Sequence, residues 1–401
     1  MPNPAYLGQS GATGTDGQSG SGTARATTAT TLGSGMGTAT SGTSPVDDTT
    51  GGRETGGTPC TGSGCVEEAR CYDAKGPSRV ELGDVDGDGR LDVVSLSFET
   101  EVLHVWSTAS DGELVVRTDH DVGARPASLA VFDTNGDGRA ELVTAVAADD
   151  RIVVIDTLDD ARFRTQLAGA PAAVDAGDAN QDGLPDLVVA TTKPAQIRWA
   201  FSLGDGTFEL GPVRSVDLAP TGVALGLVDV DAVFDAFVFQ NVAGGLGCFR
   251  GVADQGFADG VASTAAFGAY ALDTADLNHD GAVDAVISSA SSQTLEVLSD
   301  SGGLVFSSAE VIVLGETPGQ VQLADIDLDG EPEIIVAMQS TPEVWIYPGT
   351  ADLQHGEPIR AKLPGNGDGL AVGDLNGDGR PDIVASVTEA SAVCVLLADS
   401  V

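Results

Sequence analysis

The chain has 401 residues, and its 60 acidic residues against 19 Lys and Arg give a formal net charge of −41. This charge excludes a general nucleic-acid binder, because phosphate recognition needs a basic surface, and it argues against docking on anionic membranes. No run of about 18 apolar residues occurs, so no membrane-spanning segment is predicted.

Residues 1–66 are predicted to be a disordered low-complexity linker. Gly, Ser, Thr and Ala dominate this stretch, so it can bury too little surface to offset the entropy of ordering. Its start, MPNPAYLGQSG, has neither the basic nor the apolar region of a signal peptide. Flexible leaders ahead of acidic domains are typical of exported bacterial surface proteins. We therefore expect an extracellular or cell-surface protein whose signal or lipid-attachment segment lies upstream.

The five cysteines fall into two groups. Cys60, Cys65 and Cys71 lie together just before the expected domain, without the ligand spacing of a zinc site. If the protein is exported, disulfide formation in this segment before the domain is the better interpretation. Cys248 and Cys394 lie in apolar runs and are interpreted as core residues, with a Cys71–Cys394 bridge left open as an alternative.

Residues 67–401 consist of seven units of about 48 residues, and such repeats indicate a repeat architecture. Each unit is marked by an acidic loop that begins at one of seven aspartates: Asp84, Asp133, Asp178, Asp229, Asp276, Asp325 and Asp374. A short apolar run ending in small residues precedes the loop. A β-branched run, a third run and a Gly-rich hairpin with a weaker fourth run follow it.

Four strand-length runs per unit, repeated seven times, predict an all-β fold: a seven-bladed β-propeller with four-stranded antiparallel blades. The small residues before each loop fit an innermost strand, where blades crowd near the axis. The last unit stops after its third strand, AVCVLLADSV, whereas ARCYDAKGPSRV near Cys71 resembles a fourth strand with its turn. The N-terminal segment is therefore predicted to complete blade seven as its outer strand, which leaves no open edge.

Six of the acidic loops follow the pattern D-x-[DN]-x-D-G-x-x-[DE], numbered here from the first Asp. Side-chain oxygens at positions 1, 3, 5 and 9, with the carbonyl at position 7, are a ligand set that suits Ca²⁺, and Gly at position 6 permits the tight wrap. We expect about six structural Ca²⁺ ions. The predicted side-chain ligands are Asp84, Asp86, Asp88, Asp92; Asp133, Asn135, Asp137, Glu141; Asp178, Asn180, Asp182, Asp186; Asp276, Asn278, Asp280, Asp284; Asp325, Asp327, Asp329, Glu333; and Asp374, Asn376, Asp378, Asp382. The predicted carbonyl ligands are Arg90, Arg139, Leu184, Ala282, Glu331 and Arg380.

Two alternatives to this metal site explain the loops less well. An EF-hand shares the first six positions but needs a Glu at position 12, where these loops carry Ser95, Thr144, Val189, Ile287, Val336 or Ala385. A plain Asx-Gly turn would explain one loop. It would not explain why six of the seven loops carry oxygen donors at all four positions. The fourth unit has the shortened DVDAVFD at 229–235, and no metal is predicted there.

The loops in this setting resemble the FG-GAP / VCBS repeats of integrin alpha-subunit propellers and of bacterial surface proteins. Parts of the naming motif are present as Gly169-Ala170-Pro171 and Phe267-Gly268, and the hairpin SLGDGTFEL at 202–210 is similar to the family's turn between the third and fourth strands. The resemblance covers about 330 residues and implies calcium loops on one face, with ligands on the opposite face.

No catalytic constellation stands out, so we expect a binding protein and not an enzyme. His104, His120, His279 and His355 are scattered among units, and no nucleophile motif is present. The leading hypothesis is a monomeric adhesion or protein-binding module that engages an unknown protein or glycan on the face opposite the calcium loops. A lectin-like carbohydrate-binding propeller is the alternative, and a polysaccharide lyase on a related fold is the third reading. Trp106, Trp199 and Trp345 on third strands are predicted to pack between blades.

Overall fold

The computed structural model describes residues 66–398 except 218, 229–232, 240–245, 253–255, 259, 264–267 and 301–303. The predicted linker, apart from Val66, and the cysteines Cys60 and Cys65 lie outside this part of the chain. No helix in the described residues is long and apolar enough to cross a membrane.

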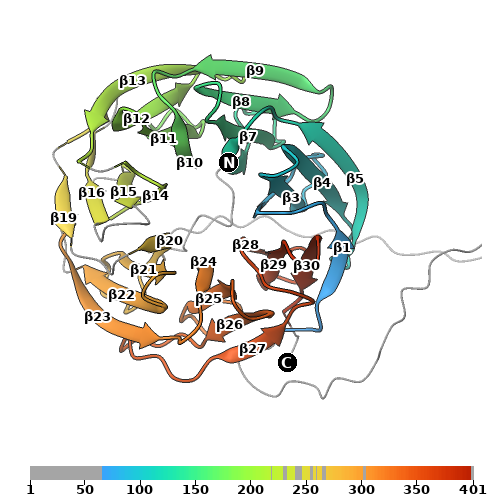
Figure 1. Cartoon of the computed structure of the whole chain (residues 1–401), viewed down its shortest axis with the longest axis vertical. Coiled ribbons are helices and arrows are strands. Elements are labelled where there is room, and N and C mark those ends of the chain that lie inside the picture. Colours follow the sequence, from blue (N-terminus) through green and yellow to red (C-terminus); the bar gives the residue numbers. More distant parts are fainter. Residues whose placement is uncertain are drawn as a thin grey trace, which may run out of the picture. The chain divides into compact units, whose positions relative to one another are not determined.

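The described residues form seven four-stranded antiparallel sheets arranged in a ring, which confirms the predicted seven-bladed propeller (Figure 1). Blades one to three consist of β2 (Arg79–Gly83), β3 (Asp92–Ser97), β4 (Val102–Thr108) and β5 (Leu114–Asp121); β6 (Pro126–Phe132), β7 (Glu141–Val146), β8 (Arg151–Asp156) and β9 (Ala161–Gln166); and β10 (Pro171–Gly177), β11 (Asp186–Thr192), β12 (Ala195–Ser202) and β13 (Phe208–Ser215).

Blade four is shorter and carries an additional two-stranded sheet. It consists of β14 (Gly222–Gly226), β15 (Asp235–Phe239), β16 (Leu246–Phe249) and β19 (Val261–Ser263), with β17 (Gly251–Val252) paired to β18 (Gly256–Phe257). Blades five to seven consist of β20 (Ala269–Ala275), β21 (Asp284–Ser289), β22 (Thr294–Asp300) and β23 (Phe306–Val313); β24 (Pro318–Ala324), β25 (Glu333–Met338), β26 (Glu343–Tyr347) and β27 (Ile359–Lys362); and β28 (Leu370–Gly373), β29 (Asp382–Val387), β30 (Ala392–Leu396) and β1 (Arg70–Asp73).

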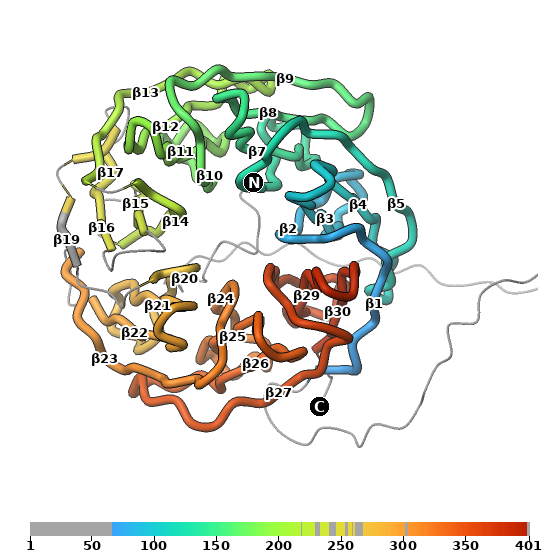
Figure 2. The backbone as a smooth tube through the Cα atoms, in the orientation of Figure 1, coloured from blue at the N-terminus to red at the C-terminus, as the bar shows by residue number. Residues whose placement is uncertain are grey.

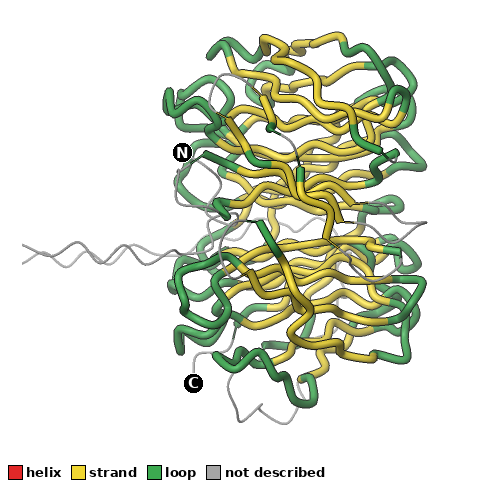
Figure 3. The backbone as a smooth tube through the Cα atoms, turned by 90° about the vertical axis from the view of Figure 1, so that its left-hand side faces the viewer, coloured by secondary structure: helices red, strands yellow, loops and turns green. Residues whose placement is uncertain are grey.

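Glycine closes the innermost strands of blades one and seven, where a neighbouring blade or strand comes close. A Cβ on Gly83 would lie 2.5 Å from Val131 of the next blade, and one on Gly373 would lie 2.6 Å from Leu91. Both distances are inside van der Waals contact, so a larger residue at either position would require the Val131 or Leu91 side chain to shift. Loops connect the strands at both faces of the ring, and no described segment is helical (Figure 3).

The ring closes through the N-terminal strand, as predicted. β1 lies beside the strands of blade seven (Figure 2) and pairs with β30, which places Cys71 directly opposite Cys394. A disulfide joins these two cysteines. Cys394 is thus buried and bonded, whereas Cys248 is buried as a free thiol. Val66, which the sequence assigned to the linker, forms an isolated bridge with Ala398.

The hydrophobic core lies between successive blades, because each sheet buries both faces against its neighbours. Trp106 packs with blade-seven residues including Val393, and Trp199 packs with blade-four residues including Val238. Trp345 packs with blade five, and these three indoles are at most 4% exposed. The prediction that they pack between blades is confirmed.

Candidate metal centre

The acidic loops join the first and second strands of their blades, and aspartate side chains fold each loop on itself. In blade one, Asp84 at position 1 accepts the N–H groups of Gly87 and Asp88 on Oδ1, at 2.7 and 3.1 Å, and that of Gly89 on Oδ2, at 2.9 Å. Asp86 Oδ1 accepts the N–H of Asp88, and Asp88 Oδ1 accepts that of Arg90. A carboxylate offers about four acceptor sites, so each still has capacity for a cation.

Positions 4 and 6 have left-handed backbone in all six complete loops, which the wrap requires. Position 6 is glycine throughout, with φ from +86 to +95° at Gly89, Gly138, Gly183, Gly281, Gly330 and Gly379. The predicted role of this glycine is therefore confirmed. Position 4 was not singled out from the sequence, since it also holds Gln181, His279 and Leu328, with φ of 61, 58 and 62°.

The position-9 acid joins the loop to the rest of its blade. Asp92 Oδ2 accepts the N–H groups of Val85 and Asp86, while Oδ1 accepts that of Thr108, which lies 16 residues further along at the end of the third strand. Asp186, Asp284 and Asp382 repeat this pattern with Ser202, Asp300 and Ala398. The sequence predicted these acids as metal ligands and missed their structural bonds.

Burial raises the pKa of the position-9 acids above their ordinary values. The pKa reaches about 6 at Asp92, Asp186, Asp284 and Asp382, and about 7 at Glu333. Repulsion from other carboxylates of the same loop adds to the shift, such as that of Asp86 on Asp92. A bound cation would offset this repulsion and favour the charged form.

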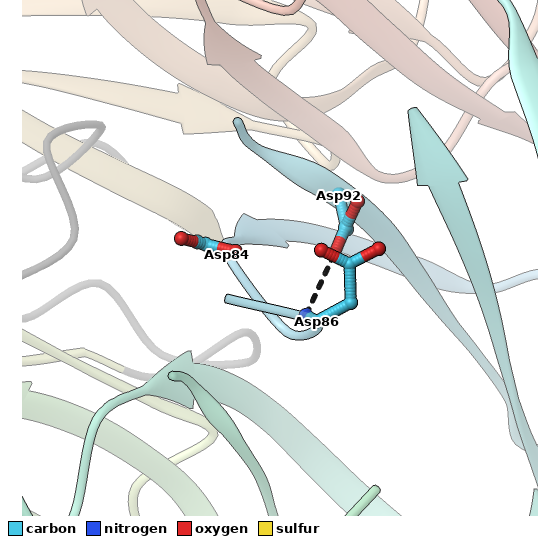
Figure 4. A group of neighbouring side chains, drawn as sticks. All are labelled: Asp84, Asp86 and Asp92. Carbon is cyan, nitrogen blue, oxygen red and sulfur yellow. Dashed lines mark hydrogen bonds between the residues drawn. The ribbon is translucent and has the colours of Figure 1, made fainter. Parts of the chain in front are cut away.

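Three loops bring carboxylates close enough to hold one metal ion. The ligand atoms of each trio lie within 4.8 Å of one another, and the trios are Asp84, Asp86 and Asp92; Asp133, Asp137 and Glu141; and Asp325, Asp327 and Glu333. Figure 4 shows the blade-one trio, in which Asp86 donates its N–H to Asp92. A hollow of about 330 Å³ beside the blade-two loop is lined by Asp137 and Glu141.

The described residues of the other three loops form no comparable trio of carboxylates. In blades three, five and seven position 3 is Asn180, Asn278 or Asn376, which leaves three acids in each loop. Their amide oxygens nevertheless accept the N–H groups of Asp182, Asp280 and Asp378, as the position-3 aspartate does in blade one. The loops of blades three, five and seven thus share the backbone conformation of the blade-one loop. Their asparagine amide oxygens can also ligate a hard cation.

In blades two, six and seven, the side chain at position 7 lies against the loop of the preceding blade. A Cβ on Gly87 would lie 2.8 Å from the Arg139 side chain, and Arg380 donates to the carbonyl of Asp327 at 3.2 Å. Glu331 lies 3.2 Å from His279 of blade five. These residues were predicted only for their carbonyls, so their contact with the neighbouring loop is an addition from the structure.

The shortened loop of blade four lies largely outside the described residues, including Asp229 and Asp231, so its predicted lack of metal stays a prediction. Its last acid, Asp235, is buried and accepts the N–H of Gly251, again 16 residues along the chain. Blade four thus retains the structural bond of position 9.

A second polar cluster, which the sequence did not reveal, lies where innermost strands begin. Tyr270 donates to Asp368 at 2.5 Å, and Gln339 donates to the same carboxylate at 2.7 Å. Arg79 donates to the Tyr270 hydroxyl at 3.3 Å and lies 3.7 Å from Asp368. The cluster joins blades one, five, six and seven, which only the ring brings together.

A family model described as FG-GAP-like repeat matches residues 84–144, 178–232 and 325–385. No curated protein gives a significant match. Among solved structures, a chain of a crystal structure of BBS1N in complex with ARL6DN aligns with a TM-score of 0.65 at 14% identity, covering 83% of this chain and 97% of that chain. A functionally unknown protein from Desulfotomaculum acetoxidans DSM 771 aligns with a TM-score of 0.56 at 11% identity, covering 80% and 100%. U3-55K aligns with a TM-score of 0.55 at 9% identity, covering 82% and 98%. At these identities the likeness extends to the fold alone.

Proposed function

Because the chain is an FG-GAP repeat β-propeller, we propose that it is a calcium-stabilised extracellular or cell-surface module that binds another protein. The observation that carries this proposal is the convergence of three carboxylates within 4.8 Å in each of three equivalent loops. The propeller fold itself is consistent with a protein-binding module, and FG-GAP repeats are typical of extracellular proteins.

The donor chemistry supports calcium over other metals. The ligand positions of the loops offer carboxylate, amide and carbonyl oxygens, and His279 in the blade-five loop is at position 4, which is not a ligand position. Flexible all-oxygen sites of this kind suit Ca²⁺. Extracellular-type sites bind with Kd of roughly 10⁻⁴–10⁻³ M, so at about 1 mM calcium each site adds about 0.4–1.4 kcal/mol of stability. The free energy contributed by several occupied sites together is comparable to the net free energy of unfolding of a domain.

The disulfide supports an oxidising compartment. A bridge between Cys71 and Cys394 persists outside the reducing cytosol, and calcium is also abundant there. The two observations are independent, since one concerns the blade-seven seam and the other the loops. Together they favour an exported protein.

The exposed apolar side chains favour a protein partner over a glycan. In the described residues, the large exposed hydrophobic side chains are all aliphatic, among them Val116, Leu158 and Val313. Sugar-stacking surfaces need exposed aromatic rings, which are not among them. We place the partner on the face opposite the calcium loops, as the resemblance implies, and propose no enzymatic activity.

Metal counting on the full chain tests the calcium role. Wild-type protein equilibrated with 2 mM calcium should retain several ions and should lose much of its thermal stability in excess EDTA. Replacing Asp84, Asp133 and Asp325 together by Asn should remove three ions, while the surface control Glu68→Gln should remove none. Equal metal content in wild type and the triple variant would refute loop binding. Labelled protein should also fail to bind a glycan array, and specific glycan binding would favour the lectin alternative.

A further inference from the structure

One arginine on the flank of blade three has no acid beside it. Arg198 of β12 lies opposite Val189 of β11 on one side and Val213 of β13 on the other. At the equivalent positions, the third and fourth strands of three other blades carry two residues that interact with each other. These pairs are His104 with Asp119, at 2.8 Å; Trp345 with Arg360, whose guanidinium carbon lies 4.2 Å from the ring centre; and Cys394 with Cys71, joined by the disulfide. In blade three a valine stands where blade one has its aspartate, so the repeat gives Arg198 no partner of this kind.

The Arg198 side chain is partly buried and forms no ion pair with any described residue. Its Nε is buried and lacks a hydrogen-bond partner. Burial lowers the pKa of Arg198, and no neighbouring carboxylate opposes this shift. By contrast, Arg117 and Arg162 on the outer strands β5 and β9 pair with Asp119 and Asp160. A desolvated cation costs free energy, so an unpaired arginine in a chain with 60 acidic residues points to an anionic partner from outside the chain.

Arg198 lines a small hollow between blades two and three. The walls are apolar and include Leu167 of blade two with Val189 and Val213 of blade three. Gln196, two residues before Arg198 on β12, adds a side-chain amide, and none of the residues that line the hollow is acidic. Its volume is about 10 Å³, the room of about one water molecule. The hollow therefore fits the end of a side chain better than a complete free ligand.

The hollow lies in the half of blade three that is away from the acidic loop. Thr191 and Gln196, which line it, flank the turn between β11 and β12, whereas the acidic loop precedes β11 at its other end. Val213 at the rim is 49% exposed, so a partner can reach it. A cationic centre surrounded by apolar side chains is typical of the anchor points of protein interfaces, in which arginine is enriched.

We propose that Arg198 and Gln196 bind the carboxylate of a glutamate or aspartate side chain of the partner protein, an inference that rests on the proposed protein-binding function. A guanidinium can donate two parallel N–H bonds to a carboxylate, which matches both its charge and its planar shape. The aliphatic part of the incoming side chain would pack against Leu167 and Val213. No residue of this site belongs to an acidic loop, so the site requires no metal.

Nuclear magnetic resonance titration of the full chain at fixed calcium tests the site, with the peptide acetyl-Ala-Ala-Glu-Ala-Ala-amide as the probe. The Nε–H resonance of Arg198 and the methyl resonances of Leu167 and Val213 should shift and saturate. The same peptide with Gln in place of Glu, and acetate alone, should each bind at least about tenfold more weakly. Acetate lacks the aliphatic stem that the apolar walls would contact.

Two variants test the role of Arg198. Arg198→Gln should weaken binding of the Glu peptide about tenfold and should not lower the melting temperature, because it removes an unpaired charge. Arg164→Gln, which changes an exposed arginine on β9, is the matched control and should bind the peptide as wild type does.

A third variant supplies the missing acid from within the chain. Val213→Glu places a carboxylate opposite Arg198, as Asp119 lies opposite His104 in blade one. It should raise the melting temperature and weaken peptide binding about tenfold, because the guanidinium is already paired. Val213→Gln should not raise the melting temperature and should weaken binding less than Val213→Glu does.

The outcomes separate the site from the proposed function. Absence of a saturable shift with the Glu peptide, or equal binding by wild type and Arg198→Gln, would overturn the site. Acetate binding as tightly as the peptide would overturn the assignment to a protein side chain. Metal counting and the glycan array do not involve Arg198, so a failure of the calcium role or a glycan ligand would be recognised independently of this titration.

Discussion

Breaking the Cys71–Cys394 disulfide should remove a large share of the stability of the ring. The bridge joins residues 323 apart in sequence and closes nearly the whole propeller into one loop. The chain-entropy relation for a closed loop of this length gives about 19 cal/mol/K, or about 6 kcal/mol at 25 °C. Residual structure in the unfolded chain lowers this value, so we expect a loss of about 4–6 kcal/mol.

Without the bridge, four residue pairs between β1 and β30 and the Val66–Ala398 contact remain to hold the outer strand of blade seven. Urea unfolding with and without reductant, at fixed calcium, measures the difference. Trp106 reports on this seam by fluorescence, because it packs with Val393 and Val395 of β30. Circular dichroism must give the same transition before a free energy is assigned.

Two controls isolate the bridge. Protein with Cys60→Ser and Cys65→Ser should lose the same stability on reduction, since the Cys71–Cys394 disulfide does not involve those cysteines. Adding Cys71→Ser to it should abolish the effect of reductant. A loss below about 1 kcal/mol with coincident transitions would refute the reasoning, because it would mean that strand pairing alone closes the ring or that the unfolded chain stays compact.

Two further predictions concern a glycine of the acidic loops and two buried acids of the innermost strands. Gly379→Ala should cost about 1–2 kcal/mol in chemical unfolding, because its φ of +88° is strained for alanine although no atom lies within 4 Å of the new Cβ. Gly356→Ala, equally uncrowded but without positive φ, should cost far less, and equal costs would contradict the backbone argument. In EDTA, the melting temperature should fall as pH rises from about 4 to about 7. Asp175 and Asp273 have folded pKa values of about 7 and 6, above those of the unfolded chain, so the folded state binds more protons in this interval. Asp175→Asn should flatten the fall, and a rise in melting temperature over this interval would show that the raised pKa values are wrong.

The fold was accessible from the sequence because each repeat encodes its own four strands and its own turn. The acidic loops fix the spacing, and the apolar runs between them are too short for anything but strands. Even the closing strand near Cys71 could be matched to fourth strands elsewhere in the chain. The disulfide was only an alternative, because a shift of a few residues in the pairing of β1 with β30 would have separated Cys71 from Cys394.

The contacts between blades were not accessible in the same way. Glu81 and two acids that raise its pKa, Asp175 and Asp273, lie within the runs VELG, VDAG and LDTA of three different blades, and only the ring brings these blades together. The Arg79, Tyr270 and Asp368 cluster likewise joins residues up to about 290 positions apart. Local sequence patterns predict the strands and turns of one blade. Clusters of residues from different blades depend on the number of blades in the ring.

The acids of each loop divide into two roles, and blade four separates them. Asp235 keeps the bond from its carboxylate to an N–H 16 residues away, as Asp92 and Asp382 do in complete loops. That bond fixes the loop against the end of the third strand and needs no metal. Blade four has nevertheless lost two residues of the loop together with its D-G pair, and it still forms a four-stranded blade. The acid at position 9 therefore serves the fold whether or not a metal is bound, and in three loops it also belongs to the carboxylate trio that we propose to hold calcium.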